Sequence, residues 1–292
     1  MKIAFIGLGE VGYCYAQAWT SAVHAVIGVC ELRGDSAMQE RAAQLNTVLH
    51  AEPGPWLQEA DVVIGAVFGS AACEVAQACV AFMRPGTVYA DFTTASAADM
   101  LAASVSAREA GVGFTDVAIM GAIALLAEAT PLMCVGEGAG RVLQLAADIG
   151  APAREISGQP GDAVRLKLLR SIMTKGMESL AVECLVAAEA MGLRGALYEV
   201  LADIDQIPLT RFMDAFVRSH VLHAGRRLAE VNESRDQLIE AGLQPLVLDG
   251  VARLFSRTRD GLLADQQRQA CTPPDTVEDR LGWLAPLAAR RA

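Results

Sequence analysis

Three glycines near the amino terminus have the spacing of a loop that binds a phosphate group. The segment Gly7-Leu8-Gly9-Glu10-Val11-Gly12 fits the pattern G-x-G-x-x-G, follows an apolar run at 2–6 and opens a helical segment. In such a turn the first glycine makes the bend, the second admits a pyrophosphate and the third lets helix and strand pack closely. The helix N-terminus attracts the anion. These six residues are therefore predicted to bind a dinucleotide, NAD or NADP.

The predicted strand at 25–31 ends on an acidic residue. Glu31 lies 19 residues after Gly12, where a carboxylate accepts hydrogen bonds from the adenosine ribose and repels a 2′-phosphate. Arg33 lies two residues further on and would instead attract such a phosphate. On this balance the sequence slightly favours NAD over NADP, and the choice stays open.

The elements that position this turn alternate through the first half of the chain. Short β-branched or apolar runs predict strands near 2–6, 25–31, 62–67, 87–91, 112–118, 131–136 and 153–157. Ala-rich segments between them predict helices at 10–22, 35–45, 70–83, 96–110 and 138–148. This alternation is typical of a doubly wound, mostly parallel sheet covered on both faces. We therefore predict an α/β dinucleotide-binding Rossmann domain over residues 1–160.

The strand pattern stops after Gly161. Helical spacing of apolar residues then predicts a long interdomain helix at 161–192. Further helices are predicted at 195–205, 209–223, 225–241 and 246–263. The predicted second domain, 161–292, is therefore an all-α substrate and dimerisation domain. Its last residues, 264–292, have weaker periodicity and are expected to wrap a neighbour or stay loose.

Composition narrows the class of protein. The chain has 292 residues, 53% of them hydrophobic and 20% charged, which fits two globular domains. Its net charge is −10 without a basic stripe, so a nucleic acid is not expected as a partner. No apolar run is long enough for a membrane span. Seven cysteines without a Cys-x-x-Cys pair predict buried thiols in the cytoplasm.

The order of motifs along nearly the whole chain resembles the β-hydroxyacid dehydrogenase family, which includes 3-hydroxyisobutyrate and 6-phosphogluconate dehydrogenases. The glycine turn matches the family's G-L-G-x-M-G, Ala66-Val67-Phe68 matches the end of its fourth strand, and Asp91-Phe92-Thr93-Thr94 matches D-x-S-T. This resemblance implies that Val67 and Phe68 contact the cofactor. It also implies that Thr94 lies near both the nicotinamide and the substrate.

The family's substrate motif is only partly kept. D-A-P-V-S-G-G aligns with residues 116–122, where Met120 replaces the serine that binds a substrate carboxylate and Ala122 replaces the second glycine. The resemblance still implies that Met120 and Gly121 line the substrate site. Either the substrate is less polar at this point, or another residue supplies the missing donor.

The resemblance also gives a catalytic residue. The family segment G-x-G-x-x-x-K-x-x-x-N aligns with Gly161 to Ser171 and keeps the lysine as Lys167. Hydride transfer changes the charge on a substrate oxygen, so a positioned proton donor lowers the barrier. Ser171 lies one helical turn after Lys167 on the same face. Arg170 is placed to pair with an anionic substrate group.

The second half departs most from the family. Glu230 falls near the family's K-D-L and, with Arg226 and Arg227, is either a solvated face or part of the substrate site. His220 and His223 have a spacing that could hold a metal together with Glu230. No further close ligand is evident, so no metal site is predicted. This helical tail is similar to that of an uncharacterised bacterial branch of the family.

Three functions are compatible with these residues. The first is an NAD(P)-dependent dehydrogenase or reductase of CH–OH groups, acting on a small, anionic hydroxy acid or related carbonyl with Lys167 as general acid/base. The second is an imine reductase, which the changes at Met120 and Ser171 suggest, although related imine reductases generally lack the lysine. The third is a catalytically silent NAD(P)-binding protein. The resemblance further implies a homodimer.

Overall fold

The computed structural model describes residues 1–32, 34–268 and 275–289. The chain forms two compact units, residues 1–172 and 173–292. The division lies within the long helix α7 (Asp162–Ala190), whereas the sequence puts the start of the second domain at residue 161. The first eleven residues of that helix, 162–172, therefore belong with the sheet-containing unit.

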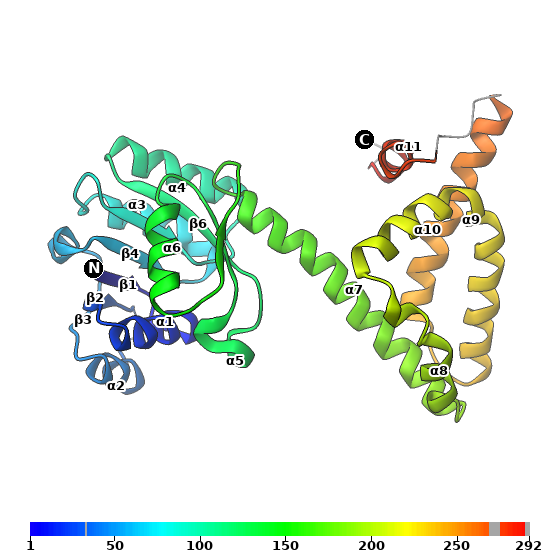
Figure 1. Cartoon of the computed structure of the whole chain (residues 1–292), viewed down its shortest axis with the longest axis horizontal. Coiled ribbons are helices and arrows are strands. Elements are labelled where there is room, and N and C mark those ends of the chain that lie inside the picture. The colour runs from blue at the N-terminus through cyan, green and yellow to red at the C-terminus, as the bar shows by residue number, and fades with distance from the viewer. Residues whose placement is uncertain (33, 269–274, 290–292) are drawn as a thin grey trace. The chain divides into compact units, whose positions relative to one another are not determined.

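An eight-stranded sheet forms the centre of the first unit (Figure 1). Its strands are β1 (Lys2–Ile6), β2 (Ala25–Cys30), β3 (Leu49–His50), β4 (Val62–Gly65), β5 (Val88–Asp91), β6 (Gly113–Ile119), β7 (Leu132–Val135) and β8 (Ala153–Glu155). They lie in the order β3-β2-β1-β4-β5-β6-β7-β8. Only the β6/β7 pair is antiparallel. The predicted mostly parallel fold is confirmed, and the two-residue β3 is the strand that the sequence missed.

Helices cover both faces of this sheet. They are α1 (Glu10–Ser21), α2 (Ser36–Gln44), α3 (Ala72–Val80), α4 (Ala97–Glu109), α5 (Ile123–Leu126) and α6 (Ala139–Asp148). Short 3-10 helices lie at Pro55–Glu59, Gly69–Ala71 and Ala127–Ala129. Ile3 and Phe5 pack with residues of α1, α2 and α6, whereas Ala4 and Ile6 pack with residues of α3 and α4. Burial on both faces explains the continuous apolar strands.

All the regular secondary structure in the described residues of the second unit is helical. It contains the remainder of α7 followed by α8 (Arg194–Leu201), a 3-10 turn at Ile204–Gln206, α9 (Leu209–Glu240), α10 (Leu246–Gln267) and α11 (Val277–Ala288). Glu183 on α7 accepts hydrogen bonds from the amides of Val247 (2.7 Å) and Leu248 (2.9 Å). One carboxylate thus satisfies two amides at the start of α10, where a helix leaves its N–H groups unpaired.

One helix boundary predicted for this unit was wrong. The helices predicted at 209–223 and 225–241 are one continuous helix, α9. A glycine inside a helix costs only about 1 kcal/mol, so Gly225 does not end it. Within the tail, for which the sequence left open wrapping a neighbour or staying loose, α11 forms with the Thr276 side chain accepting a hydrogen bond from the Asp279 amide at 3.1 Å.

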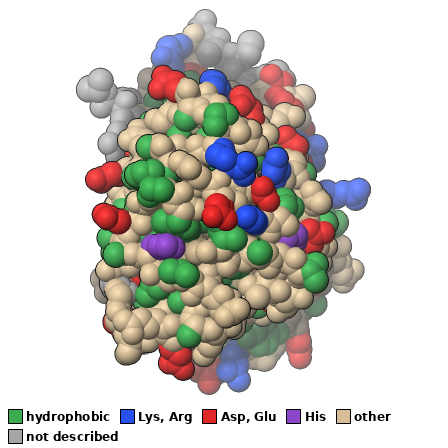
Figure 2. All heavy atoms as spheres, turned by 90° about the vertical axis from the view of Figure 1, so that its left-hand side faces the viewer, with side chains coloured by type: hydrophobic (Ala, Val, Ile, Leu, Met, Phe, Trp, Pro, Cys, Tyr) green, Lys and Arg blue, Asp and Glu red, His purple; other side chains and the backbone are tan. Residues whose placement is uncertain are grey.

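The surface of the first unit carries charges of both signs. On the face that Figure 2 shows, the described Lys and Arg side chains are interspersed with Asp and Glu, and hydrophobic side chains are scattered between them. Among the described residues, no helix is both long and apolar enough to cross a membrane.

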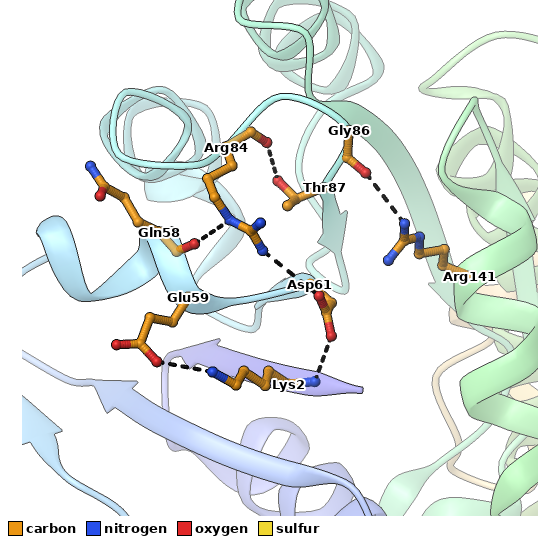
Figure 3. Close-up of polar contacts among 8 residues, drawn as sticks. All are labelled: Lys2, Gln58, Glu59, Asp61, Arg84, Gly86, Thr87 and Arg141. Carbon is orange, nitrogen blue, oxygen red and sulfur yellow. Dashed lines mark hydrogen bonds and ion pairs between the residues drawn. The ribbon is translucent and has the colours of Figure 1, made fainter.

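Ion pairs and hydrogen bonds join the amino ends of the central strands (Figure 3). At the start of β1, the Lys2 amide donates to Asp61 (2.8 Å) and the Lys2 ammonium pairs with Glu59 (3.0 Å). Arg84 lies 3.8 Å from the other oxygen of Asp61 and donates to the Gln58 carbonyl. All of these contacts are at least partly solvent-exposed.

Candidate functional site

The glycine turn lies at the opposite, carboxyl end of the sheet, between β1 and α1. Gly7 has φ +97°, and a Cβ there would lie 2.4 Å from the Ala66 carbonyl oxygen. A Cβ on Gly12 would lie 2.1 Å from the Gly7 oxygen, so α1 approaches the turn too closely for a side chain. At Gly9 a Cβ would meet no atom within 4 Å. The open space at Gly9, beside the N-terminus of α1, fits a bound pyrophosphate.

Two charged side chains border this turn. The Leu8 amide donates to Glu31, at the end of β2, over 3.1 Å, so the carboxylate lies beside the glycines as an adenosine-ribose ligand must. Arg41 on α2 donates to the Leu8 carbonyl over 2.7 Å and lies 5.0 Å from the centre of the Tyr13 ring. Arg33, the alternative contact predicted for a 2′-phosphate, is outside the described residues.

The loops after β4 and β5 continue the site away from the glycine turn. The Val67 side chain lies 3.2 Å from where a Gly7 Cβ would be, and a Cβ on Gly69 would lie 2.6 Å from the Thr94 carbonyl oxygen. Phe68, between them, is 82% exposed. The glycine turn, Val67, Phe68 and Thr94 therefore form a continuous edge across β1, β4 and β5.

Lys167 reaches this edge from α7. Its ammonium donates to the Thr94 hydroxyl oxygen over 2.8 Å, joining residues 73 positions apart in the sequence. Burial lowers the pKa of Lys167, and the negative charge of Asp116 opposes that shift. A lysine with a lowered pKa can release and recover a proton closer to neutral pH than an exposed one.

The predicted substrate residues lie around Lys167. Arg170, one turn after Lys167, donates to the Met120 carbonyl over 2.9 Å. Met120 and Ser171 are half-buried and Gly121 is exposed. A Cβ on Gly121 would lie 3.0 Å from the Thr130 methyl group. The guanidinium is thus held at the end of β6, where the family serine would have bound an anion.

Glu230, the remaining residue predicted for the substrate site, belongs to the second unit. It lies on α9 and pairs with Arg226 on the same helix. His220 accepts or donates a hydrogen bond with the Thr258 hydroxyl at 2.9 Å and lies edge-on to Phe255. Within the part of the chain that the structure describes, no three His, Cys, Asp or Glu side chains converge as metal ligands do.

The sequence prediction missed three charged residues of the site. Arg41 lies within a helix predicted from periodicity, which gave no reason to select it. Asp91 and Asp116 belong to the motifs that align with the family, but nothing in their spacing showed that they would be neighbours. In the structure they are Cα partners on β5 and β6, and both are buried.

Comparisons with known proteins agree with this architecture. The family model described as the NAD binding domain of 6-phosphogluconate dehydrogenase matches residues 2–149. A second model, described as a domain of unknown function (DUF1932), matches residues 188–258.

Individual proteins resemble most of the chain. An uncharacterised 28.5 kDa protein of Methanothermus fervidus is 24% identical over 260 residues, which cover 89% of this chain and 100% of that protein. Conserved protein MTH1747, of unknown function and described as structurally similar to 3-hydroxyacid dehydrogenases, is 28% identical, with a TM-score of 0.62 over 90% of this chain and 98% of its own. A Myxococcus stipitatus imine reductase variant in complex with NAD+ shares the fold, with 17% identity and a TM-score of 0.73 over 90% and 94% of the two chains.

Proposed function

The chain belongs to the family of the NAD binding domain of 6-phosphogluconate dehydrogenase and is an NAD(P)-dependent oxidoreductase, and from this premise we propose that it interconverts a small hydroxy acid and its carbonyl form with Lys167 as general acid/base. The resemblance that the motif order predicted is confirmed by these matches. The observation that carries the proposal is the 2.8 Å contact between the Lys167 ammonium and the Thr94 hydroxyl at the edge that follows the glycine turn.

The glycine turn and Glu31 would hold the dinucleotide, which supplies or accepts the hydride when bound. Lys167 then has one task at the substrate oxygen. During reduction its ammonium donates a proton to the oxygen as negative charge develops there, and during oxidation the neutral amine takes that proton back. Thr94 accepts a hydrogen bond from the ammonium and so fixes its direction.

Arg170 supports an anionic substrate. Its guanidinium is anchored by the Met120 carbonyl and carries donors that suit a carboxylate or phosphate. We therefore assign it the role of the donor missing at Met120, with Gly121 and Ser171 as further lining residues. A nucleic acid is not proposed as a partner, because no basic stripe occurs in the sequence.

The cofactor assignment rests on Glu31. Its carboxylate lies at the glycine turn, where it would accept hydrogen bonds from the ribose hydroxyls of NAD and repel the phosphate of NADP. Arg41 donates a hydrogen bond to the Leu8 carbonyl, and its positive charge would favour a phosphate. Direct titration of both reduced cofactors, followed by nicotinamide fluorescence, tests this: tighter binding of NADPH would overturn the preference for NAD.

Imine reduction is the second candidate. It is favoured by the TM-score of 0.73 to an imine reductase, against 0.62 to the protein likened to 3-hydroxyacid dehydrogenases, and by the apolar Met120. Lys167 favours the first candidate, because a charged proton donor suits a developing alkoxide. Screening hydroxy acids, acid semialdehydes and cyclic imines with both cofactors separates the two, and cofactor binding without turnover would favour a silent binding protein.

We also propose that the protein is a homodimer in the cytoplasm. Large hydrophobic side chains are exposed on α7 and α9 in the second unit: Leu180, Val182, Val186, Met213 and Phe216. Exposed apolar areas of this kind mark interfaces. The six described cysteines are free thiols, which suits a reducing compartment. Light scattering that gives a mass of about twice 30.8 kDa would support the dimer, and a monomer mass would refute it.

A further inference from the structure

Two carboxylates that the proposed reaction does not use lie side by side near Lys167. Asp91 ends β5, and Asp116 is its Cα partner on β6. Their exposures are 1% and 0%. Partner residues on adjacent parallel strands point to the same face of a sheet, so both side chains leave the sheet on the same side.

Asp116 binds the helix that carries Lys167. Its Oδ2 accepts hydrogen bonds from the amides of Gly161 (2.8 Å), Ala163 (3.2 Å) and Val164 (3.4 Å), which begin α7. Lys167 follows Ala163 by one helical turn, so the carboxylate sets the position from which the lysine reaches Thr94. A negative charge at this end of a helix is also favoured by the helix dipole.

Each carboxylate has a second oxygen that remains unsatisfied. Oδ1 of Asp91 accepts a hydrogen bond from the Thr93 amide at 2.8 Å. Its Oδ2 and the Oδ1 of Asp116 are buried and have no hydrogen-bond partner among the described residues. Two adjacent ionised carboxylates repel each other, and an unsatisfied buried acceptor is unfavourable. One proton between the two groups would remove both difficulties.

We propose that Asp91 and Asp116 share one proton, carried by Asp91 and donated to the free oxygen of Asp116, so that the pair holds a single negative charge that positions Lys167. Asp116 keeps the charge because three amides stabilise its anionic form, against the hydroxyl and the amide of Thr93 for Asp91. Asp116 is thereby a positioning residue. Only its effect on Lys167 in catalysis rests on the proposed function; the shared proton does not.

Among the described residues, Lys167 is the cation whose charge interaction with the pair is resolved. Five other titratable groups interact electrostatically with one of the two aspartates. They come from β5, α3, β7 and α7: Tyr89, Cys73, Cys134, Asp162 and Lys167. Burial raises the pKa of both thiols and of the phenol, which keeps them neutral. Hydrogen bonds, first from the Gln159 amide, lower the pKa of Asp162, which stays anionic.

The electrostatics of the pair agree with this arrangement. Burial raises the pKa of Asp91 to about 6, and the charge of Asp116 acts in the same direction. Burial also raises the pKa of Asp116, against the three amide hydrogen bonds that lower it. The Asp116 charge in turn raises the pKa of Lys167, opposing the effect of burial.

The test is a titration of the carboxyl carbons by NMR in protein labelled with ¹³C-aspartate, without substrate or cofactor. In the wild type we expect one aspartate carboxyl resonance to titrate near pH 6. This resonance should be absent in Asp91→Asn. In Asp116→Asn it should titrate at lower pH, because the neighbouring charge is gone. Asp236→Asn, an exposed aspartate on α9, is the control and should change none of this. Absence of such a resonance, or its persistence in Asp91→Asn, would overturn the shared proton.

A parallel titration of ¹³C-lysine, with Lys167→Met for assignment, tests the role of the charge. The Lys167 pKa should fall in Asp116→Asn, whose amide oxygen can still accept from α7, and stay unchanged in Asp91→Asn, which mimics the protonated acid. Equal pKa values in all three proteins would show that Asp116 is only a helix cap. Neither titration depends on turnover, so a failure of Lys167 as catalyst is recognised separately.

Discussion

At the amino ends of β1 and β4, Lys2 and Asp61 meet their partners at the solvent surface (Figure 3). At the carboxyl end of β5 and its partner position on β6, by contrast, two aspartates are buried, and the charge of Asp116 acts on Lys167. The first set pairs opposite charges in water, where an ion pair contributes about 0–1 kcal/mol. The second set consists of buried carboxyl groups, and burial disfavours their ionised form.

The difference indicates where function lies in this fold. Charged side chains at the amino ends need only stay hydrated and form ion pairs with their neighbours, so their contacts resemble those of any protein surface. At the carboxyl ends the glycine turn, Thr94 and Lys167 converge, and the partly satisfied aspartates adjoin them. In open α/β sheets ligands bind at this edge. The following predictions test the contrast, starting with the largest effect.

Removal of the Lys167 ammonium should have the largest effect. Lys167→Ala deletes the proton donor at the substrate oxygen, and general acid–base catalysis contributes about 10²–10⁴-fold. We expect kcat to fall by that factor on the best substrate found in the screen. Binding of the nucleotide, measured by fluorescence, should change little, because the glycine turn is untouched.

Lys175→Ala is the matched control on the same helix. Lys175 is exposed and pairs with Glu178 at 2.7 Å, so its loss should leave turnover within about twofold, as expected for an exposed pair. Unchanged turnover in Lys167→Ala would remove the proposed mechanism. A fall in nucleotide affinity parallel to that in kcat would instead indicate damage to the fold.

The buried aspartates should make stability depend on pH. Because the pKa of Asp91 is raised to about 6 in the folded protein, its protonation stabilises the fold fully below an unfolded pKa of about 3.9, and this contribution is lost as pH rises through about 6. A shift of about two units corresponds to about 3 kcal/mol. Urea unfolding between about pH 4 and pH 7 should show this decline in wild type.

Asp91→Asn removes the titrating group, so its free energy of unfolding should decline less with rising pH. Asp236→Asn should retain the decline of the wild type. An equally steep decline in Asp91→Asn would assign the pH dependence to other carboxylates. At the amino edge, Asp61 is partly exposed, so Asp61→Asn should also retain the decline. The pH dependence thus distinguishes the two ends of the sheet directly.

Gly9→Ala should separate nucleotide binding from folding. A Cβ at Gly9 meets nothing within 4 Å, so the melting temperature should hardly change. The added methyl group would occupy the space proposed for the pyrophosphate, and we expect at least a tenfold loss of affinity, about 1.4 kcal/mol. Gly140→Ala, also without a neighbour within 4 Å, is the control. Undiminished affinity in Gly9→Ala would place the pyrophosphate elsewhere.

Local signals predicted most of the fold. The glycine turn, seven strands and the long helix each leave a pattern within a short stretch of sequence. β3 has two residues and α5 has four, which is too short for periodicity to register. The break predicted between 223 and 225 is absent because packing of a long helix outweighs one unfavourable residue, Gly225.

The candidate site was only partly predictable for a related reason. Lys167 and Thr94 came from aligned motifs, but their contact spans 73 positions and depends on how α7 meets the sheet. Asp91 and Asp116 become neighbours only through the register of β5 and β6. The spacing of residues in the sequence does not reveal the register between strands, so the carboxylate pair was recognised only in the structure.

The smallest effect is predicted at the amino edge. Lys2 and Glu59 form a 3.0 Å ion pair with side chains 52% and 70% exposed. Water and salt screen such a pair, so the coupling energy from a double-mutant cycle of Lys2→Ala and Glu59→Ala should be about 0.2–1 kcal/mol and fall with added salt. A larger, salt-independent coupling would mean that this pair is shielded from solvent. Charged side chains would then be held away from water at both edges of the sheet.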